Sequence, residues 1–178
     1  KFDVKTIPSS LDTCTFAPIL NLKNSKLRKN DVCSILFGAQ NALIDTRKGF
    51  DLLIESLLEV RRIDPDFKFK LRVFGSENVE NICIKNIEIE CMGYIANEVR
   101  MAKIYNAADI FIIPSRAETL GFTAMESLAC GTPVVGYNVG GIPEVVDHKK
   151  NGFLATPFSC QEIALGIIWV HKKLKSDI

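Results

Sequence analysis

The stretch IFIIPSRAETLGFTAMESLA, residues 110–129, contains the patterns of a strand, a loop and a helix in succession. Residues 110–113 are a short apolar run, which is typical of a buried strand. We predict a helix over residues 122–129, so Glu118 lies on the connecting loop and Glu126 lies about one and a half turns into the helix. The unpaired N–H groups and the positive dipole end at the helix start then face this loop, which suits an anionic ligand.

Strand and helix patterns alternate along the rest of the chain. We expect strands at residues 32–37, 67–74, 87–90, 110–113, 133–137 and 152–155, and helices at residues 48–62, 97–107, 122–129 and 159–174. Residues 77–84 are predicted to be a short helix or turn, and residues 140–143 to open a short helix. This alternation predicts an α/β fold with a Rossmann-like doubly wound parallel sheet. In such sheets a ligand lies at the carboxyl ends of the strands.

Length and composition exclude several other classes. The 178 residues are enough for one domain with a full core, and the net charge of +1 gives no general attraction for nucleic acid. No apolar run approaches the roughly 20 residues that span a bilayer, so no transmembrane segment is expected. The six cysteines form no C-x-x-C pair and only two histidines occur, which argues against a zinc site and favours reduced thiols.

Glu118 and Glu126 flank the predicted anion site. An ionised carboxylate accepts strong hydrogen bonds from hydroxyl groups, while the helix start suits a phosphate. A sugar nucleotide carries both kinds of group. Taken alone, the pair is equally consistent with two surface glutamates near a helix start, where acids are favoured anyway.

Residues 118–126 resemble the E-x7-E motif of retaining, nucleotide-sugar-dependent glycosyltransferases with the two-domain GT-B architecture, the glycosyl transferases group 1. Other segments resemble that family in the same order along nearly the whole chain. They are residues 7–12 followed by Phe16, Phe37-Gly38, residues 47–53, Gly93-Tyr94, residues 105–109, residues 131–134 and residues 140–144.

The resemblance implies roles for individual residues. Glu126 would hold the ribose hydroxyls of the nucleotide and Glu118 would contact hydroxyls of the donor sugar. Lys48 would contact the leaving diphosphate, with help from Arg47, so Lys48 and Glu118 are the expected catalytic residues. The remaining donor-binding residues implied by the family are Gly38, Tyr94, Ile95, Leu120, Gly121, Phe122 and Thr123. At Tyr94 and Ile95 the family recognises the base largely through backbone groups and an apolar side chain, which leaves the base unidentified.

One position departs from the family pattern. Many members carry an arginine directly after the glycine that matches Gly38, whereas this chain has Ala39 followed by a longer loop, residues 40–46. Either Arg47 replaces the missing cation or the site is weaker. Two cations immediately before a helix oppose its dipole, so Arg47 and Lys48 are better placed for binding a diphosphate than for helix stability.

The family further implies a domain arrangement. Residues 1–178 would be a single donor-nucleotide-binding domain, the C-terminal half of a GT-B enzyme, with residues 1–30 as an interdomain entry segment. The N-terminal acceptor domain would be absent from this chain, so the isolated domain should be inactive alone. That absent domain would hold an acceptor glycan or lipid-linked glycan and make any peripheral contact with the membrane.

The implied reaction moves a sugar from a nucleoside diphosphate sugar to an acceptor hydroxyl with retention at the anomeric carbon. The nucleotide sugar is a co-substrate, and neither a cofactor nor a metal is expected. Family analogy suggests bacterial polysaccharide or glycolipid assembly in the cytoplasm or at the cytoplasmic face of the membrane. A nucleotide-sugar epimerase or phosphorylase of the same architecture, or a non-catalytic nucleotide-binding module, remains an alternative.

Overall fold

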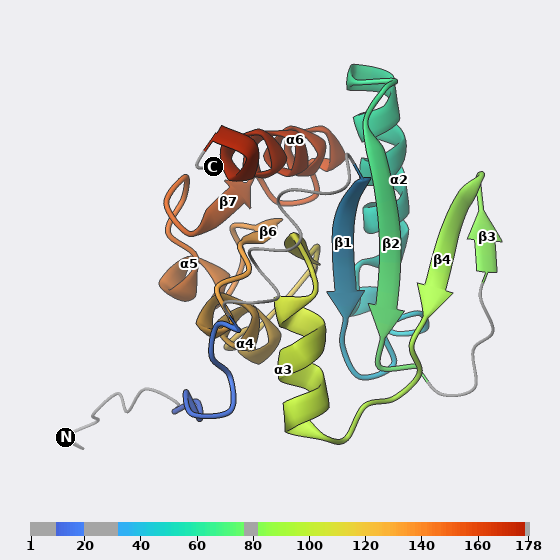
Figure 1. The fold of residues 1–178 in the computed structure, drawn as a ribbon. Coiled ribbons are helices and arrows are strands. Elements are labelled where there is room, and N and C mark those ends of the chain that lie inside the picture. Colours follow the sequence, from blue (N-terminus) through green and yellow to red (C-terminus); the bar gives the residue numbers. More distant parts are fainter. Residues whose placement is uncertain (1–9, 20–31, 77–81, 177–178) are drawn as a thin grey trace, which may run out of the picture.

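The computed structural model describes residues 10–19, 32–76 and 82–176, and its centre is a seven-stranded sheet (Figure 1). The strand order is β3-β4-β2-β1-β5-β6-β7, and all described neighbours are parallel except β3 and β4. The strands are β1 Val32–Gly38, β2 Lys68–Phe74, β3 Ile82–Ile84, β4 Ile87–Cys91, β5 Ile110–Ile113, β6 Val134–Tyr137 and β7 Gly152–Ala155. The α/β doubly wound fold predicted from the alternating patterns is confirmed.

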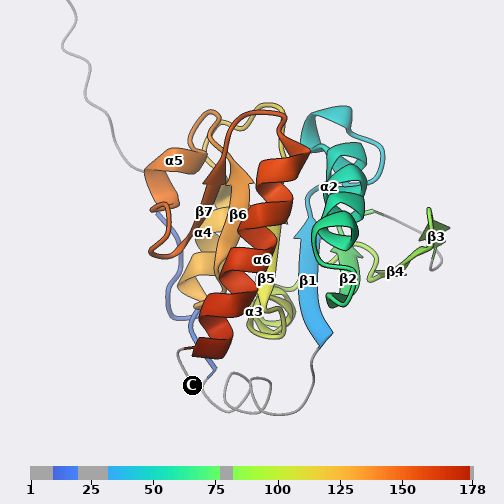
Figure 2. The same cartoon turned by 90° about the horizontal axis from the view of Figure 1, so that it is seen from above.

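Helices cover both faces of the sheet, and each face has its own apolar core. They are α2 Phe50–Ile63, α3 Glu98–Asn106, α4 Phe122–Ala129, α5 Ile142–Val145 and α6 Cys160–Ser176. α2 and α6 lie together over one face, while α3, α4 and α5 cover the other (Figure 2). In β1 the side chains of Ile35 and Phe37 enter the α2–α6 core and that of Leu36 enters the opposite one. Strands buried on both faces explain the continuous apolar runs in the sequence.

The helix expected at residues 48–62 begins two residues later, at Phe50. A 3-10 turn, Thr46–Lys48, precedes it, and Gly49 between them adopts a left-handed conformation with φ 72°. A Cβ atom at Gly49 would lie 2.0 Å from the carbonyl oxygen of Pro114, so only glycine permits this approach. The turn thereby brings Lys48 beside the end of β5.

The prediction of a helix or turn at residues 77–84 is wrong where the structure tests it. Ile82–Ile84 form β3, an edge strand paired antiparallel with β4. Lys85 and Asn86 make the two-residue connection, both with positive φ, as the tight hairpin turns that match strand twist require. Residues 77–81 lie outside the described residues.

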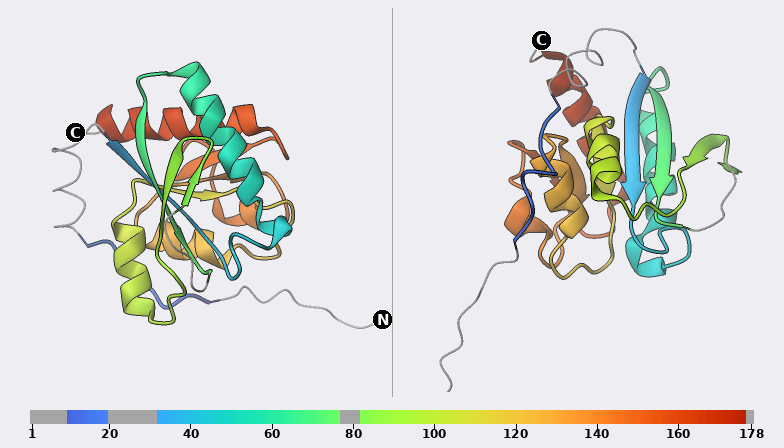
Figure 3. Two further views of the ribbon diagram at one scale, coloured as in Figure 1. Left: turned by 90° about the vertical axis from the view of Figure 1, so that its right-hand side faces the viewer. Right: turned by 60° about the horizontal axis from the view of Figure 1, so that its bottom comes forward.

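The expected entry segment, residues 1–30, is described only at residues 10–19. There the Asn106 side chain ties the segment to α3: its Oδ1 accepts from the Ile19 N–H at 2.7 Å and its Nδ2 donates to the Ala17 carbonyl at 2.9 Å. Phe16 is buried against Tyr105 of the same helix, and the segment runs beside α3 (Figure 3). Asn97 caps the start of α3, as predicted, by accepting from the Arg100 N–H at 2.8 Å.

All six cysteines lie in the described residues, and none of them forms a disulfide. Cys33 and Cys130 are buried in the two cores, whereas Cys83 on the edge strand is exposed. Within residues 10–19, 32–76 and 82–176, no helix has both the length and the apolar character needed to cross a bilayer.

Candidate functional site

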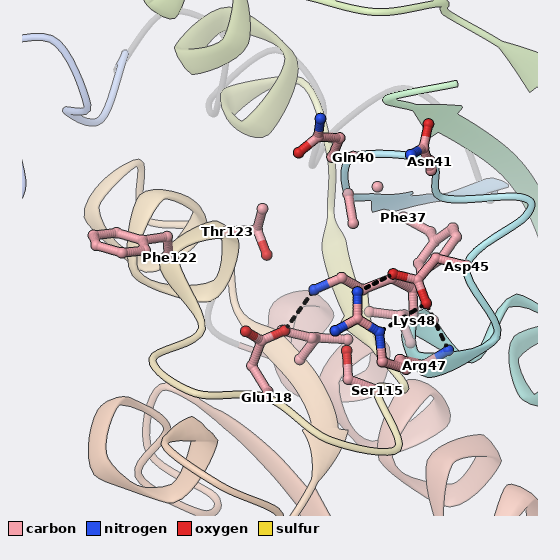
Figure 4. A pocket seen from close by; sticks show the side chains of 14 residues that line it. Phe37, Gln40, Asn41, Asp45, Arg47, Lys48, Ser115, Glu118, Phe122 and Thr123 are labelled. Carbon is pink, nitrogen blue, oxygen red and sulfur yellow. Dashed lines mark hydrogen bonds and ion pairs between the residues drawn. The ribbon is translucent and has the colours of Figure 1, made fainter. Parts of the chain in front are cut away.

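A cleft of about 440 Å³ opens at the carboxyl ends of β1 and β5 (Figure 4). The chain leaves β1 toward α2 on one face of the sheet and leaves β5 toward α4 on the other, so the cleft lies at a topological switch point. Six of the predicted site residues line it: Gly38, Arg47, Lys48, Glu118, Phe122 and Thr123. The other five, Tyr94, Ile95, Leu120, Gly121 and Glu126, are not part of this lining.

Lys48 and Glu118 form an ion pair in the cleft, with Nζ 3.0 Å from Oε2. The side chains are 24% and 16% exposed, so both charges are largely withdrawn from water. The two residues come from opposite walls and are brought together by the turn before α2 and the loop after β5. Because Nζ has three donors, Lys48 retains the capacity to contact a second anion in the cleft.

Arg47 is paired with Asp45, which also lines the cleft. Its Nε and Nη2 donate to the two carboxylate oxygens at 3.1 and 2.7 Å, and Asp45 caps the 3-10 turn by accepting from the Arg47 N–H at 3.0 Å. These hydrogen bonds lower the pKa of Asp45 below its ordinary value. The guanidinium is therefore held in one orientation at the mouth of the cleft, although its side chain is 74% exposed.

The loop after β1 closes the cleft on the side of Ala39. The Asn41 N–H donates to the Gly75 carbonyl at 2.8 Å and the Leu43 N–H to the Ser76 hydroxyl at 3.2 Å, so the loop is tied to the end of β2. Gln40 and Asn41, which follow Ala39, are exposed and line the cleft.

The start of α4 presents backbone N–H groups to the cleft. Gly121 occupies the N-cap position with φ 69°, and no side chain caps the helix. The N–H groups of Phe122 and Thr123, at the first two helical positions, therefore face the cleft with the positive end of the helix dipole behind them. Leu120 and Phe122 are 41% and 44% exposed, so neither is a core residue.

The turn at Gly140 and Gly141 supports the loop that carries Glu118. The Gly141 N–H donates to the Glu118 carbonyl at 3.2 Å. Gly140 has φ 51°, and a Cβ atom there would lie 1.6 Å from the same oxygen. The two glycines are needed because one backbone segment packs directly on the other.

Glu126 lies one turn along α4 from the cleft-lining Phe122 and Thr123. Its Oε2 accepts from the hydroxyl of the buried Tyr105 at 2.7 Å. Burial raises the pKa of Glu126 above its ordinary value of 4.5, the Tyr105 hydrogen bond lowers it, and the nearby charge of Glu98 raises it, with a net upward shift. Burial and the adjacent carboxylate likewise raise the pKa of Tyr105 well above its ordinary value of 10.0, so Tyr105 is the donor.

Glu126→Gln is expected to increase the thermal stability of the ligand-free domain at pH 7. Folding raises the pKa of Glu126. The Glu126 side chain therefore makes its full contribution to the stability of the fold below pH 4.5, its ordinary pKa, and this contribution is lost as the pH rises through the pKa of the folded state. Glutamine avoids that loss and still accepts from Tyr105. Melting temperatures measured from pH 4 to pH 8 should diverge as pH rises. Glu88→Gln, at an exposed position, is the control. A difference in melting temperature between Glu126→Gln and the wild type that widened toward pH 4 would contradict the expectation.

Tyr94 and Ile95 follow β4 and differ in exposure. The Tyr94 side chain is 59% exposed, whereas that of Ile95 is 7% exposed and packs in the core with Phe16 and Phe74. Only Tyr94 therefore offers its side chain to a ligand, and the contribution left to Ile95 is that of its backbone.

Two functional candidates were missed in the sequence. Asp45 stands two residues before Arg47, a spacing typical of a side chain that caps the following turn, and this signal was available. Tyr105 had no comparable signal, because its partner Glu126 is 21 residues away on another helix.

The Arg116 guanidinium donates to the Asp51 carboxylate and to the Thr46 carbonyl. Arg116 therefore stabilises the turn before α2.

Comparisons with known proteins identify the family of the chain. The family model described as "Glycosyl transferases group 1" matches residues 35–173. Mannosylfructose-phosphate synthase from Agrobacterium fabrum (strain C58) is 26% identical over 193 residues, which cover 96% of this chain and 41% of that protein. The chain thus spans about two fifths of the length of that relative.

Solved structures share the fold. Sucrose-phosphate synthase from Thermosynechococcus elongatus superposes with a TM-score of 0.73 at 23% identity, covering 94% of this chain and 43% of that one. Anabaena HepE, solved in complex with UDP and glucose, superposes with a TM-score of 0.68 at 20% identity, covering 97% of this chain and 51% of that one. At these identities the likeness establishes the GT-B-like α/β architecture.

Proposed function

Because the chain belongs to the glycosyl transferases group 1 family, we propose that it is the donor-binding domain of a retaining glycosyltransferase. It binds a nucleoside diphosphate sugar, and the sugar passes to a hydroxyl group of an acceptor glycan or lipid-linked glycan. A second domain outside this chain holds the acceptor in this proposal. The isolated domain accordingly binds the donor weakly and transfers little sugar.

The observation that carries the proposal is the composition of the cleft at the switch point. Lys48, Glu118 and the uncapped start of α4 meet there within about 440 Å³, and Arg47 stands at its mouth. A diphosphate fits the cation and the helix N–H groups, while the sugar hydroxyls fit Glu118. Glu126, one turn further along α4, is assigned to the ribose hydroxyls.

The proposed chemistry is electrostatic stabilisation of the leaving group. When the bond between the anomeric carbon and the diphosphate oxygen breaks, its electron pair stays on the diphosphate and negative charge develops there. Lys48 and the α4 N–H groups lie where that charge appears, and fixed groups of this kind lower the barrier to reaction. The acceptor hydroxyl forms the new bond on the same face of the sugar, and its proton passes to an oxygen of the departing diphosphate. No cofactor is assigned to this step.

Calorimetric titration of the domain with UDP, GDP, ADP and dTDP, followed by the matching sugar nucleotides, tests the proposal. We expect one nucleoside diphosphate to bind, and Glu126→Ala to weaken that binding roughly 10- to 100-fold, because charged hydrogen bonds to two hydroxyls are lost. Binding of the nucleotide with no preference for its sugar form would favour a non-catalytic nucleotide-binding module. An unchanged affinity in Glu126→Ala would exclude the ribose assignment.

A further inference from the structure

We infer that Tyr105 is a positioning residue of the donor site, whose hydroxyl holds the Glu126 carboxylate in the orientation that recognises ribose. This inference rests on the proposed function and assigns a role to a residue that never reaches the ligand itself. Tyr105 has 0% exposure, so it acts only through its partner.

The Tyr105 ring is held on three sides. Its centroid lies 6.3 Å from Phe16, 5.9 Å from Phe74 and 5.4 Å from Phe111, in edge-to-face contacts each time. Edge-to-face pairs of this kind are favoured and contribute stability beyond the burial of their area. The backbone of Tyr105 is also secured, because the Thr132 hydroxyl donates to its carbonyl at 2.7 Å. These contacts fix the position of the phenolic oxygen.

The single polar atom of this ring is directed at Glu126. The hydrogen bond joins the Tyr105 oxygen to Oε2 at 2.7 Å and links α3 to α4. Across residues 10–19, 32–76 and 82–176, no other group donates to the Glu126 carboxylate, which leaves Oε1 available to a ligand. Oε2 therefore sets the orientation of the carboxylate, and Oε1 remains for a ligand, one turn of α4 away from the residues that line the cleft.

The same bond favours the ionised form of the carboxylate. Burial and the charge of Glu98 both favour protonated Glu126, and the Tyr105 hydrogen bond favours the charged form. Cys130, at the end of α4, is the other titratable neighbour of the pair and acts on Tyr105. A charged acceptor binds hydroxyl groups more strongly than a neutral one, so Tyr105 supports ribose recognition by charge as well as by geometry.

Tyr105→Phe is the test, because it removes one oxygen and keeps every ring contact. The variant and the wild-type domain are titrated with UDP, GDP and ADP, each beside its 2′-deoxy counterpart, from pH 5 to pH 8. We expect the affinity for the preferred ribonucleotide to fall roughly 10-fold, since a charged hydrogen bond is lost from the site. The affinity for the deoxy form should fall less, so that discrimination between the two shrinks. The pH below which binding weakens should move upward, because the pKa of Glu126 rises when its donor is removed.

Tyr137→Phe is the matched control, since Tyr137 is equally buried and its hydroxyl faces the Cys160 sulfur, not the donor site. It should leave both the ribose discrimination and the pH profile unchanged. In a Glu126→Gln background, Tyr105→Phe should alter affinity much less than in the wild type, because its effect passes through the carboxylate.

The outcomes separate this inference from the proposed function. If the wild type binds a nucleotide, Glu126→Ala weakens that binding and Tyr105→Phe behaves like the wild type, the positioning role is overturned and the donor site stands. A uniform loss for ribose and deoxyribose forms with an unshifted pH profile also overturns it. If the wild type binds none of the nucleotides, the donor site and this inference both fail.

Discussion

Lys48→Ala is expected to weaken binding of the nucleoside diphosphate sugar roughly 100-fold, the magnitude of a lost charged hydrogen bond to a phosphate. The substitution acts twice. It removes the cation placed to meet the diphosphate, and it leaves the Glu118 carboxylate, only 16% exposed, without its partner at 3.0 Å. An unpaired carboxylate in the cleft then repels the incoming phosphates. Calorimetric titration of the preferred nucleotide and its sugar form measures the effect.

Lys70→Ala is the matched control for Lys48→Ala. Lys70 also forms an ion pair, with Glu90 at 2.6 Å, but it is 61% exposed and lies near the amino end of β2, whereas the cleft lies at the carboxyl ends of β1 and β5. Its loss should change affinity little, because exposed pairs contribute little. The double variant Lys48→Met with Glu118→Gln removes both charges at once. If that variant bound the diphosphate as tightly as the wild type, Lys48 would serve only to neutralise Glu118 and the phosphate assignment would be wrong.

Gly140→Ala is expected to destabilise the domain by about 3 kcal/mol or more and to abolish donor binding, combining overpacking with a strained left-handed backbone. A Cβ atom at this position would lie 1.6 Å from the Glu118 carbonyl oxygen and 2.8 Å from its carbon, both of them backbone atoms. Because a backbone atom cannot turn aside as the end of a side chain can, the loop carrying Glu118 must move. Chemical denaturation and nucleotide titration together measure the two losses.

Gly93→Ala separates overpacking from backbone strain. Gly93 has φ 72°, comparable to that of Gly140, but a Cβ atom there would meet nothing within 4 Å. It should therefore cost only about 1–2 kcal/mol, the strain of placing alanine in the left-handed region. Equal destabilisation by the two variants would show that Gly140 is required for its φ alone, and that its contact with the Glu118 loop contributes nothing.

Local patterns were sufficient for most elements. The apolar run at residues 110–113 and the helix at residues 122–129 coincide with β5 and α4, because buried parallel strands and short helices have distinct periodicities. Ile82–Ile84 were assigned wrongly because three residues carry no measurable period, and the turn at Lys85 and Asn86 lacks the glycine that usually marks a hairpin.

The sequence by itself determined the doubly wound class and the order of the elements other than β3, since both follow from short-range periodicity and turn residues. Only the tertiary structure decided which polar groups meet. Lys48 reaches Glu118 across 70 positions of sequence, and the Tyr105 hydroxyl reaches Glu126 from another helix. Such contacts depend on how α2, α3 and α4 pack against a twisted sheet, and no local pattern in the chain encodes the distance between two side chains on different elements.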